Sequence, residues 1–182
     1  MRDHGFTLFE VLVTLSLVVG ATLSVAQLTV VTARDLRIAR LQTATAALAT
    51  SRLEELRSLE WSFDATGASV EDLSTNLASE SPGQNGSGLA PSPGRVLEEN
   101  TAGYVDFLDT HGRWVSSGPD VPRGAAFVRR WAVERPADGS TDSLVIQVLV
   151  RPVTEDVPRS GRRPAFARGE TRLVSLRTRV AR

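Results

Sequence analysis

Histidines and carboxylates are the side chains of this sequence that could support acid–base or metal chemistry, because cysteine and lysine are both absent. The two histidines, His4 and His111, are far apart in the sequence. A lone histidine without cysteine supports neither a zinc site nor a Ser–His–Asp triad, and a Ser–Lys pair would need a lysine. The chain therefore has no thiol nucleophile, no disulfide and no thiolate-bound metal.

Paired carboxylates are the remaining candidates for general acid–base catalysis. The pairs that stand close together in the sequence are Asp106 with Asp109, Glu98 with Glu99, and Glu155 with Asp156. Each pair lies in or beside an expected loop or strand edge, where solvation and turn formation explain its presence. We therefore interpret all three pairs as structural.

An oxygen-rich segment, ADGSTD, is similar in composition to a calcium-binding loop. Its polar residues are Asp138, Ser140 and Asp142. The segment lacks the glycine and the terminal glutamate that such a loop has at fixed spacing, so a hairpin turn is the better interpretation. From these residues we expect no enzyme, no catalytic residue, no metal site and no cofactor.

A carboxylate at the start of an apolar segment is the most unusual feature of the sequence. Glu10 directly precedes a run from Val11 to Ala33 that contains no charged residue. As a helix this run of about 23 residues would span roughly 35 Å, enough to cross a hydrocarbon core of about 30 Å. A carboxylate inside a membrane is costly unless it is paired, so it normally marks a function. Position alone leaves a second interpretation open, in which Glu10 lies among the lipid headgroups.

The segment GFTLFE, residues 5–10, stands directly before this run and resembles the class III signal of type IV pilins and type II secretion pseudopilins. The resemblance implies that a prepilin peptidase cuts between Gly5 and Phe6 on the cytoplasmic side and methylates the new amine of Phe6. It also implies that Glu10 becomes the fifth residue of the mature chain and pairs with an N-terminal amine during filament assembly. Residues four apart lie about 6 Å apart along one helix face, so the amine could belong to the same chain or to a neighbouring subunit.

The charges that flank the apolar run leave its orientation open. Arg2 precedes the run and is offset by an aspartate, whereas Arg34, Arg37 and Arg40 follow it. The positive-inside rule would place the C-terminal side in the cytoplasm, whereas the family resemblance implies a single-pass inner-membrane protein with a periplasmic C-terminal domain. Ordinary signal-peptide cleavage after residues 24–26 is a further alternative.

A single long helix is expected from about Phe6 to about Leu59. The chain has no glycine or proline from Ala21 to Asp64, and its second half is rich in strong helix formers. The apolar positions in that half are Leu41, Ala44, Leu48, Leu53, Leu56 and Leu59. Arg52 and Arg57 are expected on the polar side, with glutamates. We therefore divide the helix into an apolar half, 6–33, and an amphipathic half, 34–60. The resemblance implies that the apolar half serves as membrane span and filament core and that residues 1–5 are a leader peptide.

The remaining residues, 61–182, predict a globular domain, which the resemblance places in the periplasm. Residues 79–94 are rich in serine, glycine and proline and are expected to form a mobile surface loop. Residues 153–169 are a second, basic loop, interpreted either as a partner surface or as a solvated edge. The absence of cysteine excludes the disulfide-closed loop that many pilins carry.

Strand signals in this domain predict two hairpins and one further strand. Residues 103–109 and 113–118 flank a turn at 110–112, and residues 127–134 and 143–152 flank a turn that contains Asp138-Gly139. VIQVLV, within the second hairpin, is apolar on both faces and is expected as the central strand. The last segment, Thr171 to Val180, alternates, with Val174, Leu176 and Val180 on one face. The expected fold is therefore α+β and pilin-like, with a small antiparallel sheet against the second half of the long helix.

The resemblance implies a structural subunit of a type IV pilus or type II secretion pseudopilus, first in the inner membrane and then in the filament. Its expected partners are the prepilin peptidase, other pilin or pseudopilin subunits, the inner-membrane assembly platform and, before assembly, membrane lipid. ALATSRLEELRSL is similar to the helix of minor pilins of the V or I type, which favours a minor subunit. The sequence leaves open which machine, for motility, secretion or DNA uptake, uses the subunit.

Two other functions remain open at this point. One is a membrane-tethered periplasmic binding or enzymatic domain with an uncleaved signal anchor. The other is a filament subunit whose sheet binds a ligand such as DNA, which the scattered arginines permit. Nucleic acid is not an expected partner, because the formal net charge is zero and gives no basic excess.

Overall fold

The computed structural model describes residues 7–70, 89–156 and 169–179. The chain forms two compact units, residues 1–40 and residues 41–182. The cleavage-site residues Gly5 and Phe6, most of the expected loop 79–94 and most of the expected loop 153–169 lie outside the described residues.

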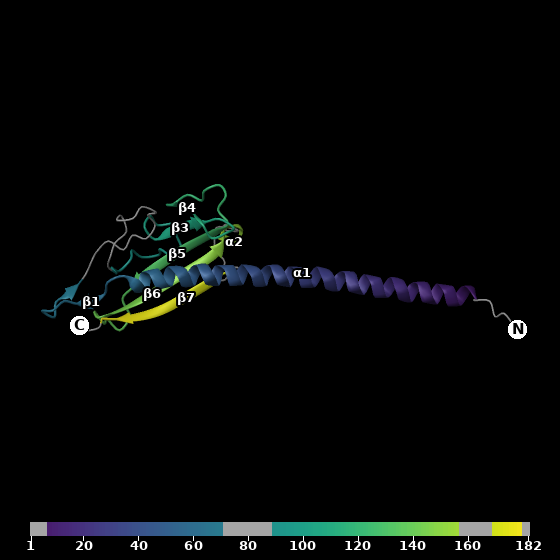
Figure 1. The fold of residues 1–182 in the computed structure, drawn as a ribbon, viewed down its shortest axis with the longest axis horizontal. Helices are drawn as coiled ribbons and strands as arrows, with labels where there is room; N and C mark the ends of the chain where they lie inside the picture. The colour runs from purple at the N-terminus through teal and green to yellow at the C-terminus, as the bar shows by residue number, and fades with distance from the viewer. Residues whose placement is uncertain (1–6, 71–88, 157–168, 180–182) are drawn as a thin grey trace. The chain divides into compact units, whose positions relative to one another are not determined.

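Helix α1, Leu8–Ser58, confirms the prediction of a single long helix (Figure 1). It begins after Thr7, whose side-chain oxygen accepts a hydrogen bond from the backbone N–H of Glu10 at 3.3 Å and so caps the first turn. Continuous helix formers and the absence of proline carry it through 51 residues. Arg57 lies in its last turn, where a cation interacts favourably with the negative end of the helix dipole.

The second unit contains an antiparallel sheet of five strands in the order β4-β3-β5-β6-β7. The strands are β3 Val105–Leu108, β4 Trp114–Ser117, β5 Phe127–Glu134, β6 Ser143–Pro152 and β7 Thr171–Thr178. Both predicted hairpins are present, since β3 pairs with β4 and β5 pairs with β6 in antiparallel register. The predicted α+β architecture, a helix packed on a small antiparallel sheet, is confirmed.

A short hairpin that the sequence analysis did not predict follows the helix. Strands β1, Ser62–Phe63, and β2, Ser69–Val70, pair in antiparallel register. The carboxylate of Asp64 closes the turn between them by accepting hydrogen bonds from the backbone N–H groups of Thr66 and Ala68, at 2.8 and 2.9 Å. These hydrogen bonds lower the pKa of the exposed Asp64 carboxyl, with the bond from the Thr66 hydroxyl as the largest cause.

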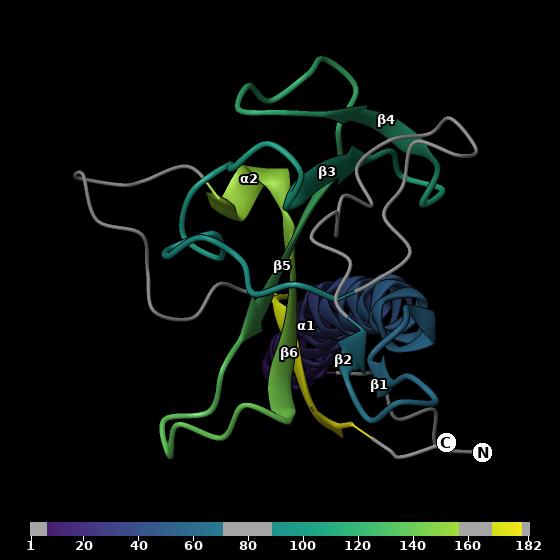
Figure 2. The ribbon, with the colours of Figure 1, turned by 90° about the vertical axis from the view of Figure 1, so that its left-hand side faces the viewer.

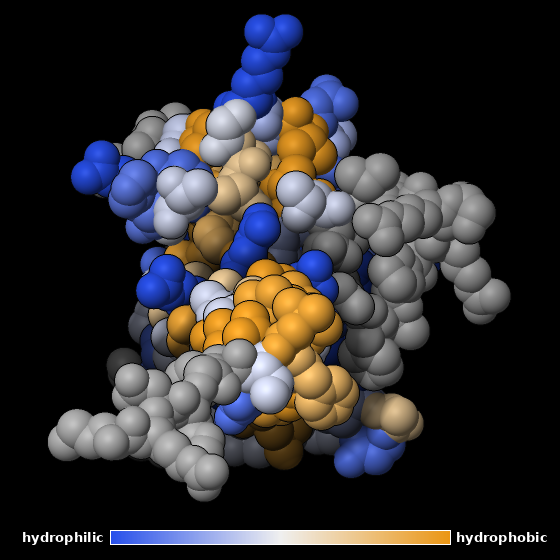
Figure 3. All heavy atoms as spheres, turned by 90° about the vertical axis from the view of Figure 1, so that its right-hand side faces the viewer, coloured by the Kyte–Doolittle hydropathy of each residue, from blue (hydrophilic) through white to orange (hydrophobic). Residues whose placement is uncertain are grey.

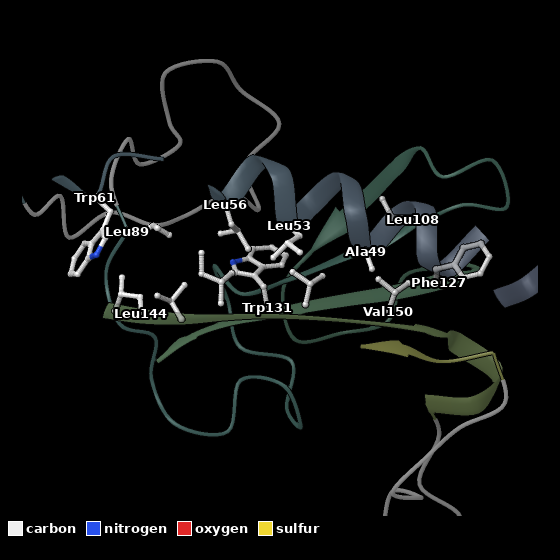
Figure 4. Close-up of a cluster of buried hydrophobic side chains, with 13 residues drawn as sticks. Ala49, Leu53, Leu56, Trp61, Leu89, Leu108, Phe127, Trp131, Leu144 and Val150 are labelled. Carbon is white, nitrogen blue, oxygen red and sulfur yellow. The ribbon is translucent and has the colours of Figure 1, made fainter. Parts of the chain in front are cut away.

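The hydrophobic core lies between the second half of α1 and one face of the sheet (Figure 4). Leu53 and Leu56 from the helix meet Trp131 from β5, and the expected stripe residues Leu41 and Leu48 pack against the same cluster. Figure 2 shows α1 on one side of the sheet and the short helix α2, Val153–Asp156, on the other. The side chain of Val153 packs there against a smaller buried cluster formed by Val105, Phe107 and Val128.

The second unit departs from two expectations. β6 is an interior strand, but the middle position belongs to β5, which pairs with β3 and β6. The segment expected as a basic loop after residue 152 begins with α2. Val174 and Leu176 share one face of β7, as predicted, and that face is exposed, at 61% and 64%. The opposite face is turned toward α1, where Leu173 packs against the core and the hydroxyl of Thr171 contacts that of Thr45.

One end of the expected surface loop is part of the core. Leu89 and Ala90 are buried, and the backbone N–H of Leu89 donates to the carbonyl of Glu60 at 3.1 Å. The hydroxyl of Ser92 donates to the carbonyl of Val133 at 3.1 Å, which ties this segment to the end of β5. The described residues of 79–94 are therefore anchored, contrary to the prediction for them.

Candidate functional site

The N-terminal segment is the first candidate site, and of its three predicted residues only Glu10 is described. Glu10 lies in the first turn of α1 and is exposed to solvent. Thr7 and Glu10 have the spacing of a capping box, and a carboxylate at this position also interacts favourably with the positive end of the helix dipole. This local explanation for Glu10 was missed by the sequence analysis, although the T-x-x-E spacing was visible there. It gives Glu10 a favourable place at the helix start independent of any amine.

The apolar half of α1 exposes large hydrophobic side chains along its length. From Leu8 to Val31 these side chains are between 41% and 80% exposed. Figure 3 views the molecule onto the N-terminal end of α1 and shows hydrophobic side chains gathered there. The chain therefore has one described helix that is long and apolar enough to cross a membrane, which fits a membrane anchor or a signal sequence. An exposed apolar surface of this size is typical of a segment that contacts lipid or other proteins.

Hydroxyl groups within this half are hydrogen-bonded to the helix itself. The hydroxyl of Thr14 donates to the carbonyl of Glu10 at 2.9 Å, and that of Ser16 donates to the carbonyl of Leu12 at 2.8 Å. Thr22, Ser24, Thr29 and Thr32 make the same bond to the carbonyl four residues earlier. Because each donor is satisfied locally, these side chains do not need water and can enter an apolar environment.

A buried charge cluster inside the second unit is the other polar constellation, and it consists of Arg52, Asp106 and Arg129. Asp106 on β3 is fully buried. Arg129, on the adjacent strand β5, donates to it through Nε at 3.0 Å and through Nη2 at 2.6 Å. Arg52 on α1 donates to the same carboxylate through Nη2. Two charge-assisted contacts thus come from the sheet and one from the helix.

Further contacts fix both arginines of this cluster. Arg129 Nη1 donates to the backbone carbonyl of Leu48 on α1 at 3.2 Å. The guanidinium of Arg52 lies over the ring of Trp131, 4.5 Å from its centroid, and its Nη1 is 2.9 Å from a carboxylate oxygen of Glu55. The two buried arginines therefore face one buried carboxylate, Asp106, and the exposed carboxylate of Glu55 supplies the second negative charge at the edge of the cluster.

Burial is the dominant electrostatic effect at Arg52. It lowers the pKa of the guanidinium, the positive charge of Arg129 lowers it further, and Asp106 and Glu55 oppose this change. An arginine stays protonated under such conditions, so the cluster is a permanent set of charges. Both oxygens of Asp106 accept hydrogen bonds from guanidinium groups. The arrangement therefore suits holding the helix on the sheet, and it leaves Asp106 poorly placed to accept a proton from a substrate.

The predicted position of Arg52 on the polar side of the helix is wrong. Its side chain is almost completely buried and points at the sheet. In the sequence, Thr45, Ala49 and Leu56 stand one or two helical turns from Arg52, and in the structure all four are buried on one face of α1. What the sequence could not supply was the partner, which lies 54 residues away.

The carboxylate pairs considered from the sequence are separated by the fold or engaged in local structure. Asp109, unlike Asp106, lies in the turn after β3 and accepts hydrogen bonds from the backbone N–H groups of His111 and Arg113, at 2.7 and 2.9 Å. The bond from Arg113 is the main reason that the pKa of Asp109 lies below its usual value. Glu98 and Glu99 flank the exposed side chain of Arg95, at 3.6 and 3.1 Å. The side chains of Glu155 and Asp156 are outside those described.

The oxygen-rich segment also has structural contacts. Asp138 accepts a hydrogen bond from the backbone N–H of Ser140 at 3.0 Å, which is turn chemistry. Asp142 lies 3.6 Å from Arg179. Within the described parts of the chain, no group of three or more histidine, aspartate or glutamate side chains is arranged to hold a metal ion.

Comparisons with protein-family models, with curated proteins and with solved structures give no match to this chain. A function for this chain is therefore inferred from its N-terminal sequence and from the contacts of its helix and sheet.

Proposed function

We propose that this chain is a structural minor pilin or pseudopilin subunit. A prepilin peptidase would cleave it between Gly5 and Phe6 and methylate Phe6, and its helix would then assemble into a type IV pilus or type II secretion pseudopilus. The observation that carries the proposal is the junction of GFTLFE with a continuous helix whose first half exposes apolar side chains and whose second half is packed in a core.

The two halves of α1 have different requirements, and assembly would satisfy both. The second half is already covered by the sheet of its own unit. The first half, with its internally bonded hydroxyl groups, needs lipid or other apolar helices around it. A subunit that waits in the inner membrane and then joins a filament through this half meets that need in both states.

Glu10 has a distinct role in this proposal. In a membrane or a filament core its carboxylate needs a cation, and cleavage before Phe6 would create one as the new terminal amine. A neighbouring subunit's amine would neutralise Glu10 only when the two helices are in the correct register. The capping position of Glu10 favours the helix start, and the amine would add the intermolecular contact.

A structural rather than catalytic role is proposed for the globular unit. Its buried carboxylate, Asp106, is occupied by two arginines, and Asp109 and Asp138 are occupied in turns. The membrane-tethered binding or enzymatic domain is the competing function, and it differs in requiring an uncut N-terminus.

The deciding experiment is the mass of the N-terminal peptide from membrane-purified protein, made in cells with and without the prepilin peptidase. A peptide that begins at methylated Phe6 and disappears without the peptidase is the expected result. A peptide that begins at Met1 in both cells would reject cleavage and favour the tethered domain. Gly5→Val is the variant that should block cleavage. Gly20→Val is its control, because a Cβ added at Gly20 would have no other atom of the chain within 4 Å.

A further inference from the structure

We infer that Arg34, Arg37 and Arg40, here called the arginine ladder, bind the phosphate groups of anionic phospholipids at the end of the apolar half of α1. The inference rests on the part of the proposed function that places this half in the membrane before assembly. It concerns the first unit of the chain only.

The helix places the ladder on one side and in sequence along its axis. Residues three apart are neighbours on a helix surface, so Arg37 lies next to both Arg34 and Arg40. The ladder rises about 9 Å from its first to its last residue. All three side chains belong to exposed residues of α1.

The ladder is not neutralised by the chain. Asp35 stands inside it, but it is one residue from Arg34, two from Arg37 and five from Arg40, and none of these spacings brings side chains together on a helix. Among the described residues, no carboxylate forms an ion pair with any ladder arginine.

Other exposed arginines of the chain contrast with the ladder. Arg57 lies 3.1 Å from Glu54, three residues earlier, and Arg95 lies 3.1 Å from Glu99, four residues later. In both cases a glutamate lies close enough to neutralise the arginine, within helix α1 for Arg57 and within a turn for Arg95. The ladder lacks such a residue at every corresponding position, so its net positive charge remains available to an outside anion.

The length of the apolar run sets the depth of the ladder. The run from Val11 to Ala33 is about as long as a hydrocarbon core is thick, so Arg34 follows at the membrane–water boundary. Long arginine side chains reach from that depth to the headgroup region, and a guanidinium binds a phosphate through two parallel hydrogen bonds. Anionic headgroups attract such clusters, whereas zwitterionic headgroups carry no net charge to do so.

The test uses the purified full chain in detergent, titrated with phosphatidylglycerol or with phosphatidylcholine of the same acyl chains. Native mass spectrometry counts the lipids that remain bound. Each arginine near an anionic headgroup should contribute about fivefold in affinity, so the wild-type chain should prefer phosphatidylglycerol by at least about tenfold.

Two triple variants remove the same charge from different places. Arg34→Gln with Arg37→Gln and Arg40→Gln should bring the preference to within about twofold. The control replaces three exposed arginines of the globular unit, Arg113, Arg123 and Arg135, by glutamine and should keep the wild-type preference. A ladder variant that keeps the preference, or a control variant that loses it equally, would overturn the inference.

A competition arm separates a lipid site from a site for a soluble anion. Inorganic phosphate in excess should leave phosphatidylglycerol bound, because the apolar half of α1 holds the lipid chains beside the ladder. Displacement of the lipid by phosphate would assign the ladder to a soluble anion and reject the inference.

The N-terminal mass of the same sample keeps this test distinct from the test of the proposed function. An uncut chain that still selects phosphatidylglycerol would reject the filament subunit and support the ladder. A cut and methylated chain without lipid selectivity would reject the ladder alone.

Discussion

Replacing Asp106 by asparagine should strongly destabilise the globular unit. Asparagine keeps the shape of the side chain and one hydrogen-bond acceptor, but it removes the charge that Arg52 and Arg129 share. Because Asp106 is fully buried, water cannot replace the lost charge. The variant would leave two guanidinium groups in the core with only the partly exposed Glu55 as a counter-charge.

The size of the effect follows from the kind of contact that is lost. Removing one partner of a buried ion pair costs about 3–5 kcal/mol, because the remaining charge is uncompensated. For a domain of this length, 1 kcal/mol lowers the melting temperature by about 3 °C, so the expected decrease is roughly 10–15 °C. An exposed ion pair would contribute about 1 kcal/mol or less.

Thermal unfolding of the full chain in detergent micelles, followed by near-ultraviolet circular dichroism, measures this decrease. The ring of Trp131 lies under Arg52, so its signal reports on the cluster. Asp109→Asn is the matched control, because it makes the same chemical change in a turn where the amide oxygen can still accept hydrogen bonds. The control should lose about 1 kcal/mol or less.

Two results would refute the reasoning about the cluster. One is an Asp106→Asn variant whose melting temperature lies within about 2 °C of that of Asp109→Asn. The two variants would then differ by less than about 1 kcal/mol in free energy of unfolding, which would mean that the charge of Asp106 is not needed. The other concerns a variant in which Arg52, Asp106 and Arg129 are all replaced by leucine or methionine. Buried ion clusters can be replaced by apolar residues with little loss, so this variant should recover most of the stability, and a further decrease would contradict the electrostatic explanation.

Three other predictions test the helix, one turn and the orientation. Glu10→Ala should leave N-terminal cleavage intact and reduce incorporation into filaments several-fold, as measured by immunoblot of sheared filaments; equal incorporation would remove Glu10 from assembly. Gly112→Ala should lower the free energy of unfolding by about 1–3 kcal/mol more than Gly139→Ala, as measured by thermal unfolding. Both glycines have positive φ, but only at Gly112 would the added Cβ lie 2.9 Å from Leu48 Cδ2. Equal losses of stability in the two variants would mean that Leu48 moves aside freely. A reporter enzyme fused after the last residue should be active in the periplasm, and cytoplasmic activity would show that the arginines after the apolar run determine the orientation.

Local sequence determined the long helix and the two larger hairpins, β3–β4 and β5–β6. Helix α1 was predictable because its stability depends on residue type and on the absence of proline, both of which act within a few residues. The cap at Thr7 is equally local, although the prediction did not use it. The β5–β6 hairpin was predictable because Asp138-Gly139 supplies the backbone conformation that its turn requires, and Gly139 has φ 76°. The apolar run of α1 was equally plain, since length and composition define it.

Strand order and the direction of single faces were decided only by the tertiary structure. β7 alternates in sequence, and either face could have been the buried one; the face with Leu173 is the one packed against α1, which leaves Val174 and Leu176 outside. The short hairpin β1–β2 was missed because its strands are only two residues each and carry almost no pattern.

The charge cluster shows most clearly why sequence alone was insufficient. Arginines with glutamates nearby on a helix are usually solvated, and the sequence places Arg52 among such residues. Its burial depends on a carboxylate from β3 and on an aromatic ring from β5, which reach it only after the strands have paired. Propensity acts along the chain, whereas the desolvation of a charge depends on every group that surrounds it in space. The helix was therefore determined by the sequence itself, and the role of Arg52 in holding that helix to the sheet was decided by the fold.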